Sequence, residues 1–396
     1  MPIEKYVSPI TSRMAVFENL INLKNCAVID YSTMGHGLYN YGYIPRLTSQ
    51  DTPIKSFMTH ISETDIVLGS TKKLYQAVEE LISEYNFDAI FIMPSAIASV
   101  IGFDLKGVSR DLTAKFNKPI ISFDVGLAED YYQGNCVACA QLIQTFCKQS
   151  KRKTNTYNIL GNFANEFNYK PDTAEIIRIM ENALGQKVNF VYNEENSLDD
   201  FASITRARYN LVTSKEATKT AEYLKQEYNM PYFYFRPYGF EGTVNAIEDL
   251  RKRLNVKAND EFLRSEEKRY TNVFAQMRNI VKFQGSKISI YAKYDVAYGI
   301  NEFLVNELNA QAEAYCDLPD SNIPYCTYDN YIDSNREFNG VILSSDPVLR
   351  ILGRDDRLQI DNPIQSYKMI SPYDKPLVGF SGACHLCQML ASQMMK

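Results

Sequence analysis

The sequence predicts an α/β protein built from three doubly wound, Rossmann-like domains with parallel sheets around a central cleft. Short apolar runs typical of buried strands alternate with stretches whose apolar residues recur at helical spacing. This alternation resets three times along 396 residues, a length that accommodates two or three domains. Strands separated by helices favour parallel sheets with helices on both faces.

The first predicted domain covers residues 1–154. Its strands are expected at 27–31, 65–69, 89–94 and 119–125. Between the second and third of these, apolar residues recur at helical spacing, namely Leu74, Ala77, Val78, Leu81 and Ile82. We therefore expect a parallel strand–helix–strand unit from Asp65 onward. A polar, basic stretch, KQSKRKTN at 148–155, predicts a linker to the next domain.

The second and third predicted domains cover residues 155–270 and 271–396. Their strands are expected at 157–163, 188–192, 210–213 and 232–235, and then at 287–292, 311–315, 340–344 and 368–370. A charged helical stretch at 260–283 precedes the third set. Ligands of such sheets bind outside the carboxyl ends of the strands, where helix N-termini point. The loops expected to face the cleft are 31–37, 94–98, 126–134, 161–164, 213–216, 236–243 and 344–347.

Composition excludes several classes of function. A net charge of −5 without a polybasic run argues against a nucleic-acid partner. No apolar run reaches membrane-spanning length and the N-terminus lacks a signal-peptide layout, so a cytoplasmic protein with reduced cysteines is expected. The sequence contains neither a Walker-type loop nor G-x-G-x-x-G, so ATP and dinucleotides are not expected ligands. With three histidines, a hydrolytic site is not indicated.

Five segments in a fixed order carry a family resemblance. They read YSTMGHGLY at 31–39, ETDIVLG at 63–69 followed by Lys73 and Leu74, IGFD at 101–104, YFYFRPYGFEGT from 232, and PLVGFSGA at 376–383. Together they resemble the nitrogenase component 1 superfamily, which includes nitrogenase molybdenum–iron subunits, cofactor-assembly scaffolds and dark-operative protochlorophyllide reductases. The resemblance covers nearly the whole chain and implies the same three-domain architecture.

The resemblance also implies where metal ligands would stand, and most of those positions hold other residues. The family's cluster-binding cysteines fall near Pro9, at His36 and at Ala96. The ligands of the large cofactor fall at Thr213 or Ser214, and at Met369. The cofactor-binding candidates in the cleft are accordingly Tyr31, His36, Ser95, Ala96, Thr213, Tyr238, Glu241 and Met369. No catalytic residue is assigned.

The sequence leaves two kinds of metal site open. His36 is a cluster ligand through its imidazole, a hydrogen-bonded loop histidine, or a proton donor in the cleft. Two C-x-x-C pairs, Cys136 with Cys139 and Cys384 with Cys387, would form a zinc or iron–sulfur site if they met in space. Each pair also suits the apolar face of a helix, and the pairs belong to different predicted domains, which favours core packing over metal or dithiol chemistry.

Three functions are compatible with the sequence. The first is the ligand-poor subunit of a nitrogenase component 1-like oxidoreductase, which pairs with a related subunit and receives electrons from an ATP-dependent iron protein. An iron–sulfur cluster would then depend on the partner subunit or on non-standard ligands. The alternatives are a non-redox carrier of a cofactor or tetrapyrrole-like molecule, and a homodimeric scaffold without a small-molecule function. The sequence does not indicate the substrate.

Overall fold

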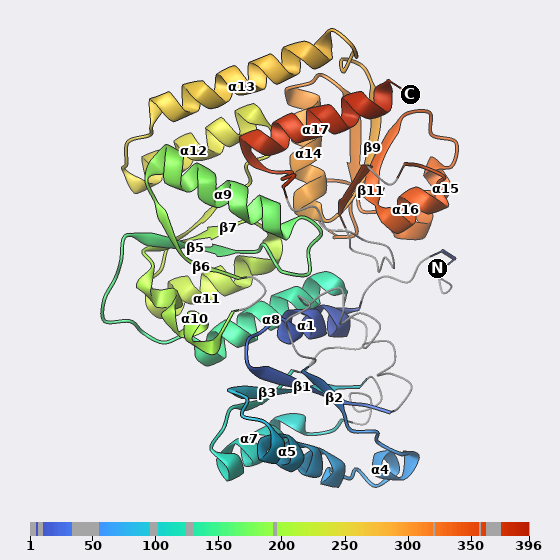
Figure 1. Ribbon diagram of the computed structural model, residues 1–396. Coiled ribbons are helices and arrows are strands. Elements are labelled where there is room, and N and C mark those ends of the chain that lie inside the picture. The colour runs from blue at the N-terminus through green and yellow to red at the C-terminus, as the bar shows by residue number, and fades with distance from the viewer. Residues whose placement is uncertain are drawn as a thin grey trace.

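The computed structural model describes residues 5–6, 11–33, 55–95, 102–123, 130–192, 196–319, 321–355, 358–361 and 374–395. These residues form three four-stranded sheets, ordered β2-β1-β3-β4, β6-β5-β7-β8 and β10-β9-β11-β12 (Figure 1). Every pairing between named strands is parallel. All three sheets thus have the same topology, in which the first strand in sequence lies second in the spatial order of the sheet. The expected α/β class with three Rossmann-like units is confirmed.

The first sheet is built from strands close to three of the four expected ones. Its strands are β1 (Cys26–Tyr31), β2 (Ser56–Met58), β3 (Ala89–Pro94) and β4 (Ile120–Ser122). Its helices are α1 (Ser12–Ile21), α4 (Glu63–Val67), α5 (Lys72–Glu84), α7 (Leu105–Phe116) and α8 (Tyr131–Phe146). Helix α5 packs through the stripe Leu74, Val78 and Leu81, as its helical spacing predicted.

The predicted strand at 65–69 is wrong, because this segment is the end of a short helix and the turn after it. Ser62 and Asp65 form a capping box, in which each side chain accepts a hydrogen bond from the other residue's backbone N–H. Val67 and Leu68, which looked like strand core, are 83% and 73% exposed. The strand that pairs with β1 at this edge of the sheet is β2.

The second sheet follows the prediction within two or three residues at each end. Its strands are β5 (Thr156–Leu160), β6 (Lys187–Val191), β7 (Tyr209–Val212) and β8 (Tyr232–Tyr234). Its helices are α9 (Tyr169–Leu184), α10 (Leu198–Ser203), α11 (Thr218–Tyr228) and α12 (Phe240–Leu254), with 3-10 turns η1 (Ile204–Arg206) and η2 (Lys215–Ala217). The charged stretch forms α13 (Asp260–Arg278), so the predicted domain limit at 270 falls inside a helix. The domain limits stay predictions.

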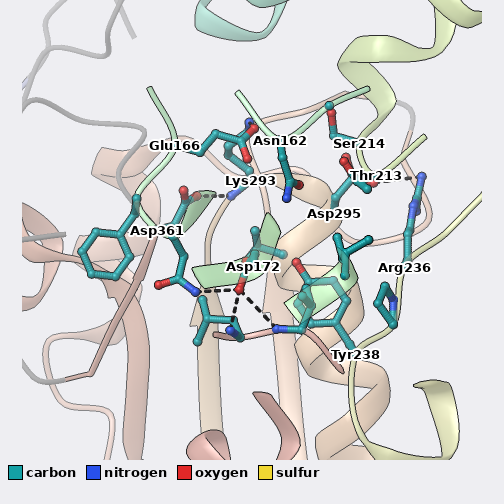
Figure 2. Close-up of a pocket in the computed structure, with 18 of the residues that line it drawn as sticks. Asn162, Glu166, Asp172, Thr213, Ser214, Arg236, Tyr238, Lys293, Asp295 and Asp361 are labelled. Carbon is teal, nitrogen blue, oxygen red and sulfur yellow. Dashed lines mark hydrogen bonds and ion pairs between the residues drawn. The ribbon is translucent and has the colours of Figure 1, made fainter. Parts of the chain in front are cut away.

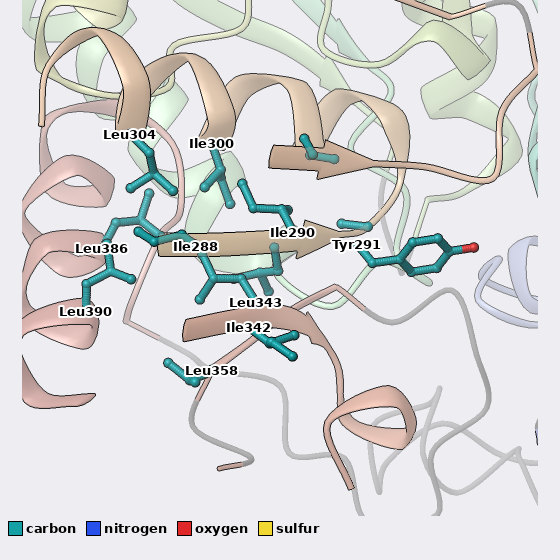
Figure 3. Packing of buried hydrophobic residues seen from close by; sticks show 14 of the residues in the cluster. Ile288, Ile290, Tyr291, Ile300, Leu304, Ile342, Leu343, Leu358, Leu386 and Leu390 are labelled. Atoms are coloured by element: carbon teal, nitrogen blue, oxygen red, sulfur yellow. The ribbon is translucent and has the colours of Figure 1, made fainter. Parts of the chain in front are cut away.

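The third sheet contains β9 (Lys287–Tyr291), β10 (Gln311–Tyr315), β11 (Val341–Ser345) and β12 (Gln359–Asp361). Its helices are α14 (Tyr294–Asn306), α15 (Tyr328–Asn335), α16 (Asp346–Ile351) and α17 (Gly379–Met394). The core between β9, β11 and α17 contains Ile288, Ile290, Ile342, Leu343 and Leu386 (Figure 3). Strand β12 was not expected, and the strand expected at 368–370 lies outside the described residues. None of the described helices has the length and apolarity needed to cross a membrane.

The three units are joined by shared helices rather than by linkers alone. Helix α8 packs against α1 so closely that a Cβ added at Gly134 would collide with the carbonyl oxygen of Ser12. The same helix also contacts α10 and α11 of the second unit, and one apolar core runs through both units. At the other end, α17 lies on α9, α12 and α13 (Figure 1). The second sheet is therefore held between helices of its two neighbours.

Candidate functional site

A cavity lies where the carboxyl ends of strands from the second and third sheets meet, which is the expected ligand position in such sheets. Its interior volume is about 40 Å³, which is room for a few water molecules. The lining includes Asn162 and Glu166 after β5, Thr213 and Ser214 after β7, Arg236 and Tyr238 after β8, Lys293 and Asp295 after β9, Asp361 in β12, and Asp172 in α9 (Figure 2).

Lys293 is the central cation of this cavity. Its Nζ lies 2.6 Å from Glu166 Oε1 and 2.7 Å from Glu216 Oε2, and its backbone N–H donates a 2.5 Å bond to Asp361 Oδ2. The side chain of Lys293 is 12% exposed and that of Glu216 is fully buried. The ion pairs join the loop after β5, the turn η2 and the start of α14, so they tie the second unit to the third.

A chain of amide side chains extends these ion pairs into the first unit. Asn135 on α8 donates from Nδ2 to Glu216 Oε1 over 3.1 Å. Asn165 donates to Asn135 Oδ1 over 2.9 Å and to Glu18 Oε2 over 3.2 Å. Glu18 belongs to α1, which is buried along nearly its whole length. One polar network thus links the first unit to Lys293 in the third.

A second ion pair closes the opposite wall of the cavity. Arg236 Nη2 lies 2.8 Å from Asp295 Oδ1, while the other oxygen of Asp295 accepts a 2.8 Å bond from the backbone N–H of Lys215. The guanidinium of Arg236 also lies over the rings of Tyr234 and Tyr294. This wall, like the Lys293 wall, is made of residues from both the second and the third unit.

Tyr238 is positioned by the loop between β8 and α12. Gly239 has a positive φ of 74°, a conformation that favours glycine, and Thr243 Oγ1 donates to the carbonyls of Pro237 at 3.2 Å and Gly239 at 2.5 Å. On its other side the Tyr238 ring lies against Gly299 of α14, where an added Cβ would collide with the ring. The loop at 236–243, one of those expected to face the cleft, therefore contributes a wall of the cavity.

Carboxylates also cap the helices that meet around the cavity. Asp172 Oδ1 accepts backbone N–H bonds from Leu377 at 2.7 Å and Val378 at 3.4 Å, just before α17 (Figure 2). In return Glu307, after α14, accepts N–H bonds from Phe240, Glu241 and Gly242 at the start of α12. Each of the two units thus caps a helix of the other.

Burial controls the ionisation of the cavity carboxyls. It raises the pKa of Glu166 to about 8 and that of Asp172 to about 7, well above the ordinary range of carboxylic acids. Burial also raises the pKa of Asp295, against the opposing effect of Arg236. The pKa of Lys293 is raised although burial opposes its charge, because the carboxylates of Glu166 and Glu216 lie beside it. Lys293 is therefore a cation at neutral pH.

Of the eight predicted cleft residues, Thr213 and Tyr238 line the cavity. Tyr31 and Ser95 are buried at the ends of β1 and β3, where Tyr31 packs on Phe103, and neither lines it. Glu241 is exposed at the start of α12 and does not line it either. His36, Ala96 and Met369 lie outside the described residues.

The four cysteines of the C-x-x-C pairs lie in two separate helices. Cys136 and Cys139 are buried in α8, while Cys384 and Cys387 lie in α17, and Cys139 and Cys387 belong to different apolar cores. Burial raises the pKa of Cys136 and Cys139 to about 12, so both are thiols at neutral pH. Across the described residues, no group of three or more His, Cys, Asp and Glu side chains is placed to hold a metal ion. The two pairs therefore do not combine into a shared metal site.

The described lining does not fit an iron–sulfur cluster. Clusters are held mainly by thiolates, with imidazole in some cases. Among the described lining residues the polar groups are carboxylates, amides, hydroxyls, one ammonium and one guanidinium, and the one expected ligand position within the described residues carries a hydroxyl, Thr213 or Ser214. Ion pairs occupy this space, and we derive no step through a cluster held by these residues.

Sequence reasoning missed the residues that dominate the cavity, namely Glu166, Lys293, Asp295 and Asp361. A signal was available for Lys293, since it follows the predicted strand at 287–292 and loops after strands were expected to face the cleft. Glu166 lies only two residues beyond the loop predicted at 161–164. Asp361 had no comparable signal, because strand β12 was not predicted.

Comparison with known proteins identifies the family. A family model described as nitrogenase component 1 type oxidoreductase matches residues 19–316, well over half of the chain. The chain belongs to this family. The resemblance expected from the five sequence segments is confirmed.

Several relatives within the family have assigned roles. The chain is 28% identical over 202 residues to the nitrogenase iron-molybdenum cofactor biosynthesis protein NifE of Bradyrhizobium diazoefficiens, covering 50% of this chain and 36% of the relative. It is 24% identical over 322 residues to a subunit of the light-independent protochlorophyllide reductase of Angiopteris evecta, covering 74% of this chain and 62% of the relative. The chain thus spans less than two thirds of the length of both.

The fold is also that of a solved nitrogenase. The structure of nitrogenase Cp1 at pH 6.5 superimposes with a TM-score of 0.80, covering 99% of this chain and 93% of the other, at 14% sequence identity. At that identity the likeness shows the fold alone. The described cavity of this component 1-type chain therefore has to be interpreted from its own residues.

Proposed function

We propose that this chain is the ligand-poor subunit of a nitrogenase component 1-like oxidoreductase that functions in a multi-subunit complex. The observation that carries the proposal is the composition of the cavity. In a fold that matches nitrogenase along its length, the expected ligand position at Thr213 or Ser214 carries a hydroxyl, and Lys293 with its carboxylates fills the space beside it. The cavity is a polar site, and none of the eight cysteines, all of them described, is among its lining residues.

The names of the relatives support membership of a larger assembly. One is a subunit of a light-independent protochlorophyllide reductase and another is a cofactor biosynthesis protein. In our proposal a related component 1 subunit supplies the thiolates for any iron–sulfur cluster, and an ATP-dependent iron protein supplies the electrons. Eight unpaired cysteines suit a reducing compartment, and we place the complex in the cytoplasm.

The surface offers an apolar pair for such a partner protein. Val67 and Leu68 end α4 and expose 83% and 73% of their area, although Val and Leu are usually buried. These two adjacent, strongly exposed aliphatic side chains precede Lys72 and Lys73 in the sequence and form a small apolar spot that a partner could cover. Helix α4 lies at the end of the molecule opposite α13 and α17 (Figure 1). We assign this face to the electron donor.

A tetrapyrrole-like carrier is not the function that the described cavity favours. Between the described residues the interior volume is about 40 Å³, whereas pockets for drug-sized ligands span roughly 300–1,000 Å³. The cavity suits a molecule of a few non-hydrogen atoms.

The proposal is tested by anaerobic purification of the chain, first alone and then co-expressed with the product of a neighbouring component 1-like gene. We expect iron–sulfur absorption and paramagnetic resonance signals only in the co-purified complex. A complex that forms but contains no iron would overturn the redox function. Stoichiometric iron in the chain alone would overturn the ligand-poor assignment.

A further inference from the structure

The charges around Lys293 do not balance. One ammonium forms ion pairs with both Glu166 and Glu216, so two carboxylates share one cation, and the carboxylate of Asp361 accepts a bond from the backbone N–H of the same lysine. Asp361 is 3% exposed and Glu216 fully buried. Uncompensated buried charge is strongly unfavourable in proteins, so the group reaches a lower energy by holding an additional proton.

Geometry indicates which carboxyl holds that proton. Glu216 accepts bonds from Lys293, Asn135 and Ser214, all of which stabilise its ionised form. Asp361 accepts a short backbone N–H bond, which acts in the same way. Glu166 bonds through Oε1 to Lys293, and the described part of the chain offers its side chain no further hydrogen bond. It has the weakest support for ionisation, in agreement with the raised pKa of about 8 that burial gives it.

Glu166 is also placed to reach a bound molecule. It lines the cavity together with Lys293 and Asp361 (Figure 2), whereas Glu216 is not among the lining residues. The network through Asn135 and Asn165 holds Glu216, and thereby Lys293, in a fixed position relative to α1 and α8. The ammonium beside Glu166 is therefore preorganised.

We propose that Glu166 gives protons to, and takes protons from, a small molecule bound in this cavity, and that Lys293 is its positioning residue. The inference rests on the proposed function in one respect. An oxidoreductase that reduces a bound molecule with electrons from a donor protein must also supply that molecule with protons. The ligand class is a molecule of a few non-hydrogen atoms that carries a basic nitrogen or oxygen.

The proton step balances without a redox partner. The O–H bond of the Glu166 carboxyl breaks, its proton bonds to the lone pair of the basic atom, and the electron pair of the O–H bond stays on the carboxylate. The ammonium of Lys293, 2.6 Å away, stabilises the new negative charge. Uptake of one proton from water restores the starting state.

The test is infrared difference spectroscopy of the full chain between pH 6 and 10, without partner, iron or reductant. We expect a protonated-carboxyl C=O band that disappears with a midpoint near pH 8 and that is missing in Glu166→Gln. Glu241→Gln is the matched control, because Glu241 is exposed and does not line the cavity. Glu18→Gln identifies the separate band of Glu18, whose pKa burial also raises to about 8.

Lys293→Gln tests the positioning role in the same measurement. Without the ammonium, the Glu166 carboxylate loses its stabilising charge, and its midpoint should rise by one pH unit or more, a tenfold or larger change in proton affinity. Lys293→Arg keeps the positive charge, so its midpoint should stay near the wild-type value. If Lys293→Gln does not fold, the comparison of Lys293→Arg with the wild type replaces it.

Two results would overturn the inference: a set of titrating bands in Glu166→Gln that is identical to that of the wild type, or a midpoint equal in Lys293→Arg and in a folded Lys293→Gln. Because this measurement needs no iron, its failure is separate from failure of the oxidoreductase assignment. Absence of iron from the complex would leave the proton site standing.

Discussion

The ammonium of Lys293, at the start of α14, lies 2.7 Å from the fully buried carboxylate of Glu216 in η2. This pair joins the second unit to the third, and through Asn135 it reaches the first. The Glu216 carboxylate therefore bonds to side chains of both neighbouring units, Lys293 in the third and Asn135 in the first.

Lys293→Met is expected to lower the free energy of unfolding by roughly 3–5 kcal/mol, because it leaves buried carboxylates without their cation. The double variant Lys293→Met with Glu216→Gln should recover part of that loss, since one buried charge is removed as well. Denaturant unfolding measures both. Lys219→Met, at an exposed position of α11, is the control and should change stability little. Equal losses in the single and double variants would contradict the role assigned to Glu216.

Asp172 makes stability depend on pH in the acid range. Burial raises its pKa in the folded chain to about 7, whereas in the unfolded chain it is near 3.8. Between these values the folded state binds the extra proton, so this group's contribution to stability is full below pH 4 and declines as the pH rises to 7. Asp172→Asn should flatten the fall in unfolding free energy over this range, by an amount on the order of a few kcal/mol. An unchanged pH profile in the variant would show that the carboxyl titrates normally.

Gly299 and Gly242 offer a matched pair of substitutions within helices. A Cβ at Gly299 would collide with the Tyr238 ring, so Gly299→Ala should cost about 1–3 kcal/mol and displace that ring from the cavity wall. At Gly242 no atom lies within 4 Å of an added Cβ, so Gly242→Ala should be neutral or stabilise α12 by up to ~1 kcal/mol. Thermal unfolding compares the two. A Gly299→Ala protein as stable as Gly242→Ala would mean that Tyr238 is not held by this contact.

The apolar pair at the end of α4 should matter for partner binding and not for folding. Val67→Ser with Leu68→Ser removes exposed apolar area, so the unfolding free energy should stay within about 0.5 kcal/mol of the parent value. Affinity for the electron-donor protein, measured by sedimentation or pull-down with the purified partner, should fall by roughly tenfold or more. Val305→Ser, on the exposed side of α14, is the control surface change. If the parent, the double variant and Val305→Ser all bind the donor with equal affinity, the electron donor does not bind at the end of α4.

The strands were predictable because their burial is expressed in local sequence. Runs such as AIFIMP at 89–94 are buried at every position and match β3 at both ends. DIVLG at 65–69 misled because three consecutive apolar residues look like a buried strand, while the capping box of Ser62 and Asp65 starts a helix that leaves Val67 and Leu68 in solvent. Apolar runs do not reveal whether a core lies beside them.

The cavity was only partly predictable for a different reason. Thr213 and Tyr238 were found through the resemblance and the rule that ligands bind beyond strand ends. The ion pairs of Lys293 with Glu166 and Glu216 join residues 127 and 77 positions apart, and no local pattern records that their loops meet. Their meeting depends on how α8 and α17 hold the three sheets together.

The most direct test of the central claim is the iron content of the anaerobically purified chain, alone and with a co-expressed component 1-type partner subunit, supported by paramagnetic resonance spectra. A ligand-poor subunit predicts no cluster signal in the chain alone and a signal in the complex. Stoichiometric cluster iron in the chain alone, or none in a stable complex, would contradict it.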